Sequence, residues 1–112
     1  RAYIVLTEDG ITEMFTIRGQ IEWEAILYAD DFYFRGQYWV RLLLESNYKP
    51  QLIRPAWFWR FDRLYESKGV KAVYLRTMGL EIDSMQLVAL IRRMKEADVP
   101  GRIELLNGCL LK

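Results

Sequence analysis

Histidine is absent from this chain, and cysteine occurs only once, as Cys109. The lack of histidine removes the commonest general base near neutral pH and the commonest metal ligand. It also excludes catalytic systems that pair a serine or cysteine nucleophile with histidine. One cysteine is too few for an internal disulfide or a structural zinc site. Because Cys109 lies in an apolar run, we expect it to be a buried structural thiol. From the lack of these ligand residues we predict no metal and no cofactor.

Glycine-rich phosphate-binding motifs are also missing. The seven glycines are isolated, and neither G-x-G-x-x-G nor G-x-x-x-x-G-K occurs. The sequence therefore gives no reason to expect nucleotide phosphates held in a glycine cradle. Each glycine lies next to the expected end of an element, so turns explain all of them.

Long apolar runs and an excess of one charge are absent as well. No apolar segment approaches the roughly 18 residues of a membrane span, and we expect no leader of the signal-peptide type. We therefore expect a cytoplasmic protein without a membrane partner. Sixteen Lys+Arg against fifteen Asp+Glu leave a net charge of +1. Global charge thus does not indicate a nucleic-acid partner, although it leaves room for a local basic patch.

The chain does have abundant apolar and aromatic residues. With 112 residues, 52% of them hydrophobic and 14% aromatic, it is long enough for one domain with a real core, over residues 1–112. This composition argues against disorder. The aromatic residues exceed what a small core needs, which favours a contact surface or an oligomer.

Two hairpins, one strand and one helix follow from local patterns. Residues 2–17 alternate apolar and polar side chains around Asp9-Gly10, which predicts a β-hairpin whose turn uses a positive φ. Residues 70–76 read as a buried strand. Asp83, with a glutamine three residues later, predicts the start of a helix that Val99-Pro100-Gly101 ends. Residues 102–112, with Asn107-Gly108 between two apolar runs, predict a second hairpin.

Residues 19–47 fit more than one structure. Residues 21–27 are compatible with a short helix, and residues 30–36 with a connection that carries aromatic side chains. Residues 38–45 fit a second helix, which their Leu, Arg and Glu content favours. The same run also fits a strand with Tyr38, Val40, Leu42 and Leu44 on one face, and periodicity does not decide between the two for short apolar runs.

These elements predict an α+β fold. We expect a small, mainly antiparallel sheet with N-terminal and C-terminal β-hairpins and about three to four helices packed on it. The predicted core consists of Ile4, Leu6, Phe15, Ile17, Leu43, Phe58, Phe61, Val73, Leu75, Leu87, Ile91, Met94, Ile103 and Leu105.

An aromatic segment supplies the main functional hypothesis. Pro55 suits the first turn of a helix that Gly69 ends. At about 100° per residue, one arc of this helix carries an apolar set suited to the core, namely Trp57, Phe58, Phe61, Leu64 and Tyr65. Trp59 falls near the opposite pole, among charged residues. A large indole on a charged face predicts a surface that another molecule covers.

The predicted contact residues are Trp59, Arg60 and Arg63, with Arg54 and Lys68 nearby. Tryptophan and arginine together are typical of protein–protein hot spots, so we expect a non-enzymatic interaction module that binds another protein or a second copy of itself. Aromatic and basic residues also suit single-stranded nucleic acid, which is the alternative hypothesis.

The adjacent acids Asp62 and Glu66 argue against a phosphate ligand at this face, because they would repel it. A third hypothesis is an enzyme that uses Asp30 and Asp31 with a hard cation such as Mg²⁺. Because neighbouring side chains point apart on a strand or helix, we expect these two aspartates to be solvated instead.

Overall fold

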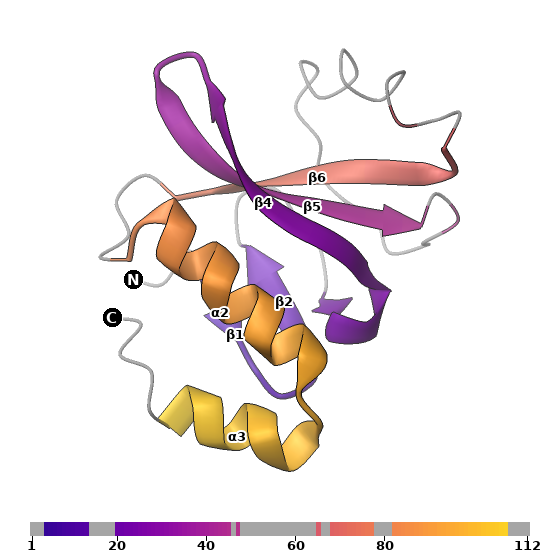
Figure 1. The fold of residues 1–112 in the computed structure, drawn as a ribbon, viewed down its shortest axis with the longest axis vertical. Helices are drawn as coiled ribbons and strands as arrows, with labels where there is room; N and C mark the ends of the chain where they lie inside the picture. Colours follow the sequence, from indigo (N-terminus) through magenta and orange to yellow (C-terminus); the bar gives the residue numbers. More distant parts are fainter. Residues whose placement is uncertain are drawn as a thin grey trace.

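The computed structural model describes residues 4–13, 20–45, 47, 65, 68–77 and 82–107. Within this part of the chain, two three-stranded antiparallel sheets and two α-helices form the fold (Figure 1). The α+β class is confirmed. The predicted architecture of one small sheet with three to four helices is wrong, because the described residues form two sheets and only two α-helices.

The first sheet contains β1 (Ile4–Leu6), β2 (Gly10–Glu13) and β3 (Ile21–Glu22), in that order. The antiparallel pairing of β1 with β2 confirms the N-terminal hairpin over residues 4–13. The reason for its glycine differs from the prediction, since the positive-φ glycines of the described residues are Gly36 and Gly69. A Cβ on Gly10 would lie 2.2 Å from the Ile21 carbonyl oxygen. Gly10 therefore permits close approach of β3.

The second sheet contains β4 (Ile26–Phe34), β5 (Gln37–Glu45) and β6 (Val70–Arg76), with β5 in the centre. The predicted helix over residues 38–45 is wrong and the alternating strand is right. Pairing with strands on both sides, which buries Val40, Leu42 and Leu44 completely, overrides the helix propensity of the leucines. The predicted strand over residues 70–76 is confirmed.

Residues 21–27 also differ from the predicted short helix. They form β3, a single 3-10 turn η1 (Trp23–Ala25) and the start of β4. The indole of Trp23 is fully buried and donates a hydrogen bond to the Thr7 carbonyl at 2.8 Å. This bond ties η1 to the turn between β1 and β2.

Helix α2 (Ser84–Glu96) begins as its sequence predicts. The Asp83 carboxylate accepts from the Gln86 amide at 2.7 Å, and the Gln86 side chain accepts from the Asp83 amide, which completes a capping box. Leu87, Ile91 and Met94 are buried on its inner face.

Helix α3 (Val99–Asn107) replaces the predicted C-terminal hairpin, which is therefore wrong over residues 102–107. Asp98 caps the new helix by accepting from the Gly101 amide at 2.9 Å. Pro100 lies in the first turn, where no intrahelical N–H is required, so the segment expected to end one helix begins another. Neither helix is long and apolar enough to cross a membrane, within the residues described.

The β4–β5–β6 sheet has a first face that carries Val40, Leu42 and Leu44, and a second face that carries Trp39 and Leu43. The main core lies where α2 packs against the first face and against the smaller sheet. Six predicted core residues are buried in it: Ile4, Val73, Leu75, Leu87, Ile91 and Met94. Leu6 and Leu105 are partly buried against it. Leu43 packs instead on the second face of the sheet, and Ile103 is 44% exposed. Phe15, Ile17, Phe58 and Phe61 lie outside the described residues.

Candidate protein-interaction surface

The β4–β5 hairpin ends in a two-residue turn formed by Arg35 and Gly36. Their φ values are 51° and 82°, so both central residues are left-handed, as a type I′ turn requires. Gly36 adopts this conformation without a Cβ, and arginine is an uncommon residue there. The Arg35 guanidinium lies over the Phe34 ring, 5.2 Å from its centroid. The turn fixes the register of the hairpin, in which Phe34 pairs with Gln37.

Two tyrosines next to this turn form an exposed aromatic pair. Tyr33 and Tyr38 lie directly opposite each other on the two strands, and their exposed fractions are 60% and 53%. The rings meet edge to face, with centroids 4.9 Å apart and an interplanar angle of 63°. They share the sheet face that α2 covers further along, at Val40. In Figure 1 the turn end of the hairpin projects away from α2 and α3.

The opposite face of the hairpin is stiffened by aromatic packing. Phe32 stacks on Phe34 with ring centroids 6.1 Å apart, and it lies 5.1 Å from the ring of Tyr74 on β6. Trp39 and Tyr74 are buried at the centre of this cluster, and Tyr65 packs against it. The exposed tyrosines therefore stand on a hairpin whose other face is held to the rest of the sheet.

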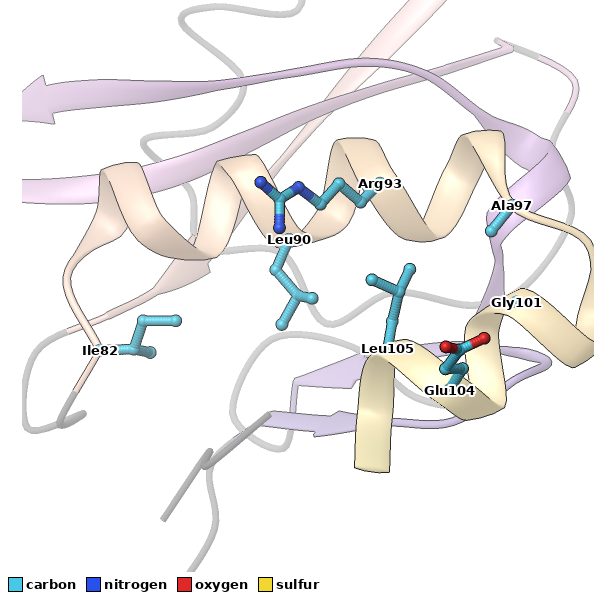
Figure 2. Close-up of a pocket in the computed structure, with 7 residues that line it drawn as sticks. All are labelled: Ile82, Leu90, Arg93, Ala97, Gly101, Glu104 and Leu105. Atoms are coloured by element: carbon cyan, nitrogen blue, oxygen red, sulfur yellow. The ribbon is translucent and has the colours of Figure 1, made fainter. Parts of the chain in front are cut away.

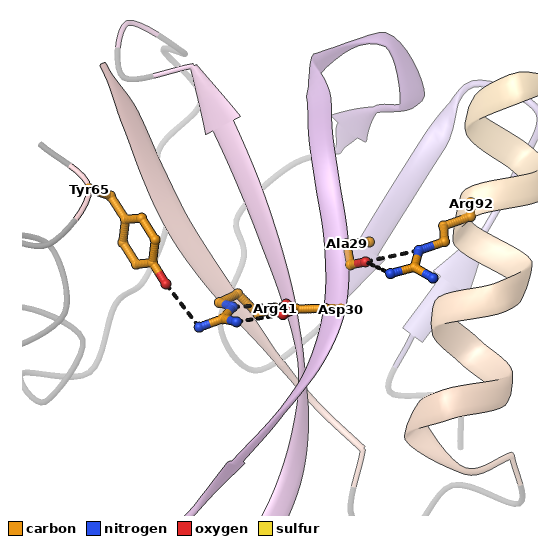
Figure 3. A network of polar contacts seen from close by, with 5 residues as sticks. All are labelled: Ala29, Asp30, Arg41, Tyr65 and Arg92. Carbon is orange, nitrogen blue, oxygen red and sulfur yellow. Dashed lines mark hydrogen bonds and ion pairs between the residues drawn. The ribbon is translucent and has the colours of Figure 1, made fainter. Parts of the chain in front are cut away.

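Arg41 joins three parts of the molecule on this second face (Figure 3). Its Nε donates to Asp30 at 2.8 Å, Nη2 pairs with the same carboxylate, and Nη1 donates to the Tyr65 hydroxyl at 2.9 Å. The guanidinium also lies 4.9 Å from the centroid of Phe32. The bonds to Asp30 raise the pKa of Arg41, so this guanidinium is a permanent cation that links β4, β5 and Tyr65.

This arrangement bears on the predicted pair of aspartates. Asp30 and Asp31 lie in β4, not in a connection, and successive residues of a strand point to opposite faces. Asp30 is engaged by Arg41, so the two carboxylates do not converge on one site. Over the described ranges, no group of three or more His, Cys, Asp or Glu side chains is arranged to hold a metal ion.

Arg92 ties helix α2 to the outer strand β4. Its Nε and Nη2 donate to the Ala29 carbonyl at 3.1 and 2.7 Å, as Figure 3 shows. The same guanidinium lies 5.6 Å from the centroid of Tyr28, which is 49% exposed. The hairpin therefore carries a third exposed tyrosine, Tyr28 on β4, and a cation lies beside it.

Most of the predicted contact face lies outside the described residues, namely Trp59, Arg60, Arg63 and Arg54. Lys68 is described: it is exposed in the turn before β6, and its amide donates to the Tyr65 carbonyl at 2.9 Å. This turn adjoins the Glu45 end of β5, opposite to the end that carries Tyr38. Lys68 and the tyrosine pair are thus not brought together.

Sequence reasoning missed the tyrosine pair because residues 30–36 were expected to be a connection. The available signal was a two-residue Arg-Gly turn between Phe32-Tyr33-Phe34 and Tyr38-Trp39-Val40, two runs of the aromatic and β-branched residues that strands favour. Comparison with protein-family models, with curated proteins and with solved structures gives no match.

Proposed function

We propose that this chain is a non-enzymatic protein-interaction module, an adaptor, inhibitor or small regulator, that acts in the cytoplasm. It binds another protein or a second copy of itself. The observation that carries the proposal is the exposed pair formed by Tyr33 and Tyr38 at the end of a projecting hairpin. Trp59, Arg60, Arg63, Arg54 and Lys68 form a second proposed contact region, to be tested separately.

The physical support comes from the cost of ordering a contact surface. Tyrosine gives a large amphipathic contact area and loses few rotamers on binding. Here the edge-to-face contact, the tight turn and the packed opposite face already hold both rings in place. Arg35 adds an exposed cation at the turn, over Phe34 on the other face of the hairpin. Tyrosine and arginine are both enriched among residues that dominate binding energy. A surface ordered in advance pays less of the association penalty.

The test is site-specific photo-crosslinking in the cells that produce the protein. A benzophenone amino acid replaces Tyr33 in one variant and Tyr38 in another, and in a control it replaces Asp9, exposed on the β1–β2 turn. We expect both hairpin probes to give a defined adduct and the Asp9 probe to give none. With the probe at position 33, Tyr38→Ser should remove the adduct. Equal yields at all three positions, or no adduct at the hairpin, would contradict the proposal.

A stability control separates lost binding from unfolding. Because both tyrosines are more than half exposed, Tyr33→Ser and Tyr38→Ser should each lower the free energy of unfolding by no more than about 1 kcal/mol, the size of a cross-strand pair. A larger loss in a urea titration would show that the pair supports the fold.

Single-stranded nucleic acid is the alternative ligand, because the aromatic and basic residues of the second contact region, such as Trp59 and Arg63, also suit base stacking beside phosphate contacts. Fluorescence anisotropy with labelled oligonucleotides decides between the two. If nucleic acid is the ligand, the affinity falls steeply as salt rises, and Arg63→Ala makes this dependence shallower. No binding at low salt removes the alternative.

A further inference from the structure

Helices α2 and α3 border an open groove with a volume of about 630 Å³ (Figure 2). Among the described residues, its apolar lining comes from Ile82 before α2, Leu90 and Ala97 along α2, and Leu105 on α3. The volume falls in the range of roughly 300–1,000 Å³ that is usual for ligand sites. The groove lies between α2 and α3, on the side of α2 that faces away from the β4–β5–β6 sheet. It belongs to neither contact region described above.

A polar side chain joins the two helices. Arg102 of α3 is only 5% exposed and donates to the Met94 carbonyl of α2 at 2.7 Å. Leu90 and Leu105 are only partly buried, and both line the groove between the helices. Apolar atoms at an open seam favour a ligand that brings apolar side chains.

The rim of the groove carries one charge of each sign. Arg93 projects from α2 and Glu104 from α3, as Figure 2 shows, and both are exposed. Neither has an ion-pair partner among the residues that the structure describes. An occupant that covers this rim has to offer an opposite charge to each, because an uncompensated charge that loses water opposes binding.

We propose that the groove binds an amphipathic helix of a partner protein, which inserts leucine-like side chains and carries one acidic and one basic residue. The acidic residue meets Arg93 and the basic residue meets Glu104. A fatty acid or another singly charged amphiphile suits the groove less well, since its carboxylate would complement Arg93 and leave Glu104 unmatched. This inference rests on the proposed function, because it assigns a partner class to an interaction module.

The probe is a labelled peptide of about 16 residues, roughly four helical turns, with leucines on one face. Three versions carry flanking charges of Glu and Lys, of two Glu, or of two Lys. Fluorescence anisotropy with the full chain should show saturable binding of the Glu/Lys peptide with a Kd below about 100 µM, and about tenfold weaker binding of the other two.

Charge reversal in the protein makes the test specific. Arg93→Glu leaves two acids on the rim, so the two-Lys peptide should now bind best; Glu104→Lys should favour the two-Glu peptide. Because both side chains are exposed, circular dichroism should show folded variants. Glu96→Lys is the matched control: it reverses an exposed α2 charge that does not line the groove, so the Glu/Lys peptide should remain preferred.

Three results would overturn the proposal. The first is no saturable binding of any of the peptides at millimolar protein, and the second is equal affinity for all three. The third is a dimer of the chain in sedimentation equilibrium that Leu105→Glu dissociates, because a second copy would then occupy the groove. If one of these results is obtained while the hairpin probes still give crosslinks, the proposed interaction role stands. Only the groove is then rejected as a binding site.

Discussion

Replacing Arg102 by methionine tests whether one buried cation holds helix α3 against the rest of the molecule. Besides the bond to the Met94 carbonyl, the guanidinium donates to the Glu8 carbonyl at 3.2 Å and pairs with Glu24 at 2.8 Å. Met94 lies in the last turn of α2, where carbonyl groups lack intrahelical partners and a cation is favourable. Arg102 thus caps one helix while it anchors the next.

The size of the effect follows from these contacts. The Glu24 side chain is 70% exposed, so its ion pair contributes at most about 1 kcal/mol. Leaving the buried Met94 carbonyl without a donor costs about 1–3 kcal/mol, and the Glu8 carbonyl adds a smaller amount. Methionine fills similar space and avoids burying a charge, which offsets part of the loss. We expect the free energy of unfolding to fall by about 3 kcal/mol.

Urea denaturation measures this loss. With a urea dependence of roughly 1.5 kcal/mol per M, the midpoint should fall by about 2 M. Hydrogen exchange of residues 99–107 should accelerate more than that of the second sheet, since α3 loses its anchor. Arg93→Met makes the same chemical change at an exposed arginine of α2 and should change stability by no more than about 0.5 kcal/mol. Equal stability of Arg102→Met and wild type would refute the reasoning.

Three further predictions concern other parts of the fold. Gly10→Ala should lower the free energy of unfolding by about 2 kcal/mol in urea titrations, because a Cβ there would lie 2.2 Å from a backbone oxygen. Asp30→Asn should cost about 2 kcal/mol by the same measurement, since it weakens the charged hydrogen bonds of the largely covered Arg41. The bond from Arg102 lowers the pKa of Glu24 below 4.5, so its stabilisation is present above that pH and lost as pH falls through the lowered value; the stability difference between wild type and Glu24→Gln should shrink accordingly.

Each of these has a result that would contradict it. A Gly10→Ala variant as stable as wild type would show that β3 shifts away without cost. Asp31→Asn is the control for Asp30→Asn, because Asp31 lies on the other face of β4; equal losses in both variants would deny the role of Arg41. A Glu24→Gln difference that grows toward acid pH would reverse the assigned sign.

Local signals predicted the elements whose own sequence determines them. The capping pair of Asp83 and Gln86 and the spacing of Leu87, Ile91 and Met94 were sufficient for α2, because cap and buried face agree. The N-terminal hairpin was also predictable. Its glycine was predicted for the wrong reason, since the close approach of β3 involves a strand 11 residues away along the chain, with Ile21 opposite Ile11.

The errors arose where a segment fits two secondary structures locally. In these segments, pairing with distant strands or a helix-capping side chain decides which structure forms. Leu42 and Leu44 suit a helix intrinsically, and only the strands on both sides of β5 make the alternation decisive. At residues 98–101 the same proline that cannot continue α2 is compatible with the first turn of α3. The side chain of Asp98 decides the outcome by capping the new helix.

The candidate surface was the least predictable part. Exposure of Tyr33 and Tyr38 depends on how far α2 extends along the sheet, which no local pattern of the hairpin encodes. Nor does the sequence make it evident that Arg35 occupies a left-handed position, because few side chains adopt it. For the groove, the predicted core residues Leu87, Ile91 and Met94 gave the inner face of α2, but the sequence predicted a hairpin where α3 lies.

The contact between Arg92 and the Ala29 carbonyl also affects how molecules behave at high concentration. Strand β4 is an outer strand of its sheet, and such strands offer backbone groups to which strands of other molecules can add. Here a guanidinium from a helix already occupies one of those acceptors with two N–H groups. A growing intermolecular sheet would have to displace this cation first, so the fold carries its own protection against edge-to-edge aggregation.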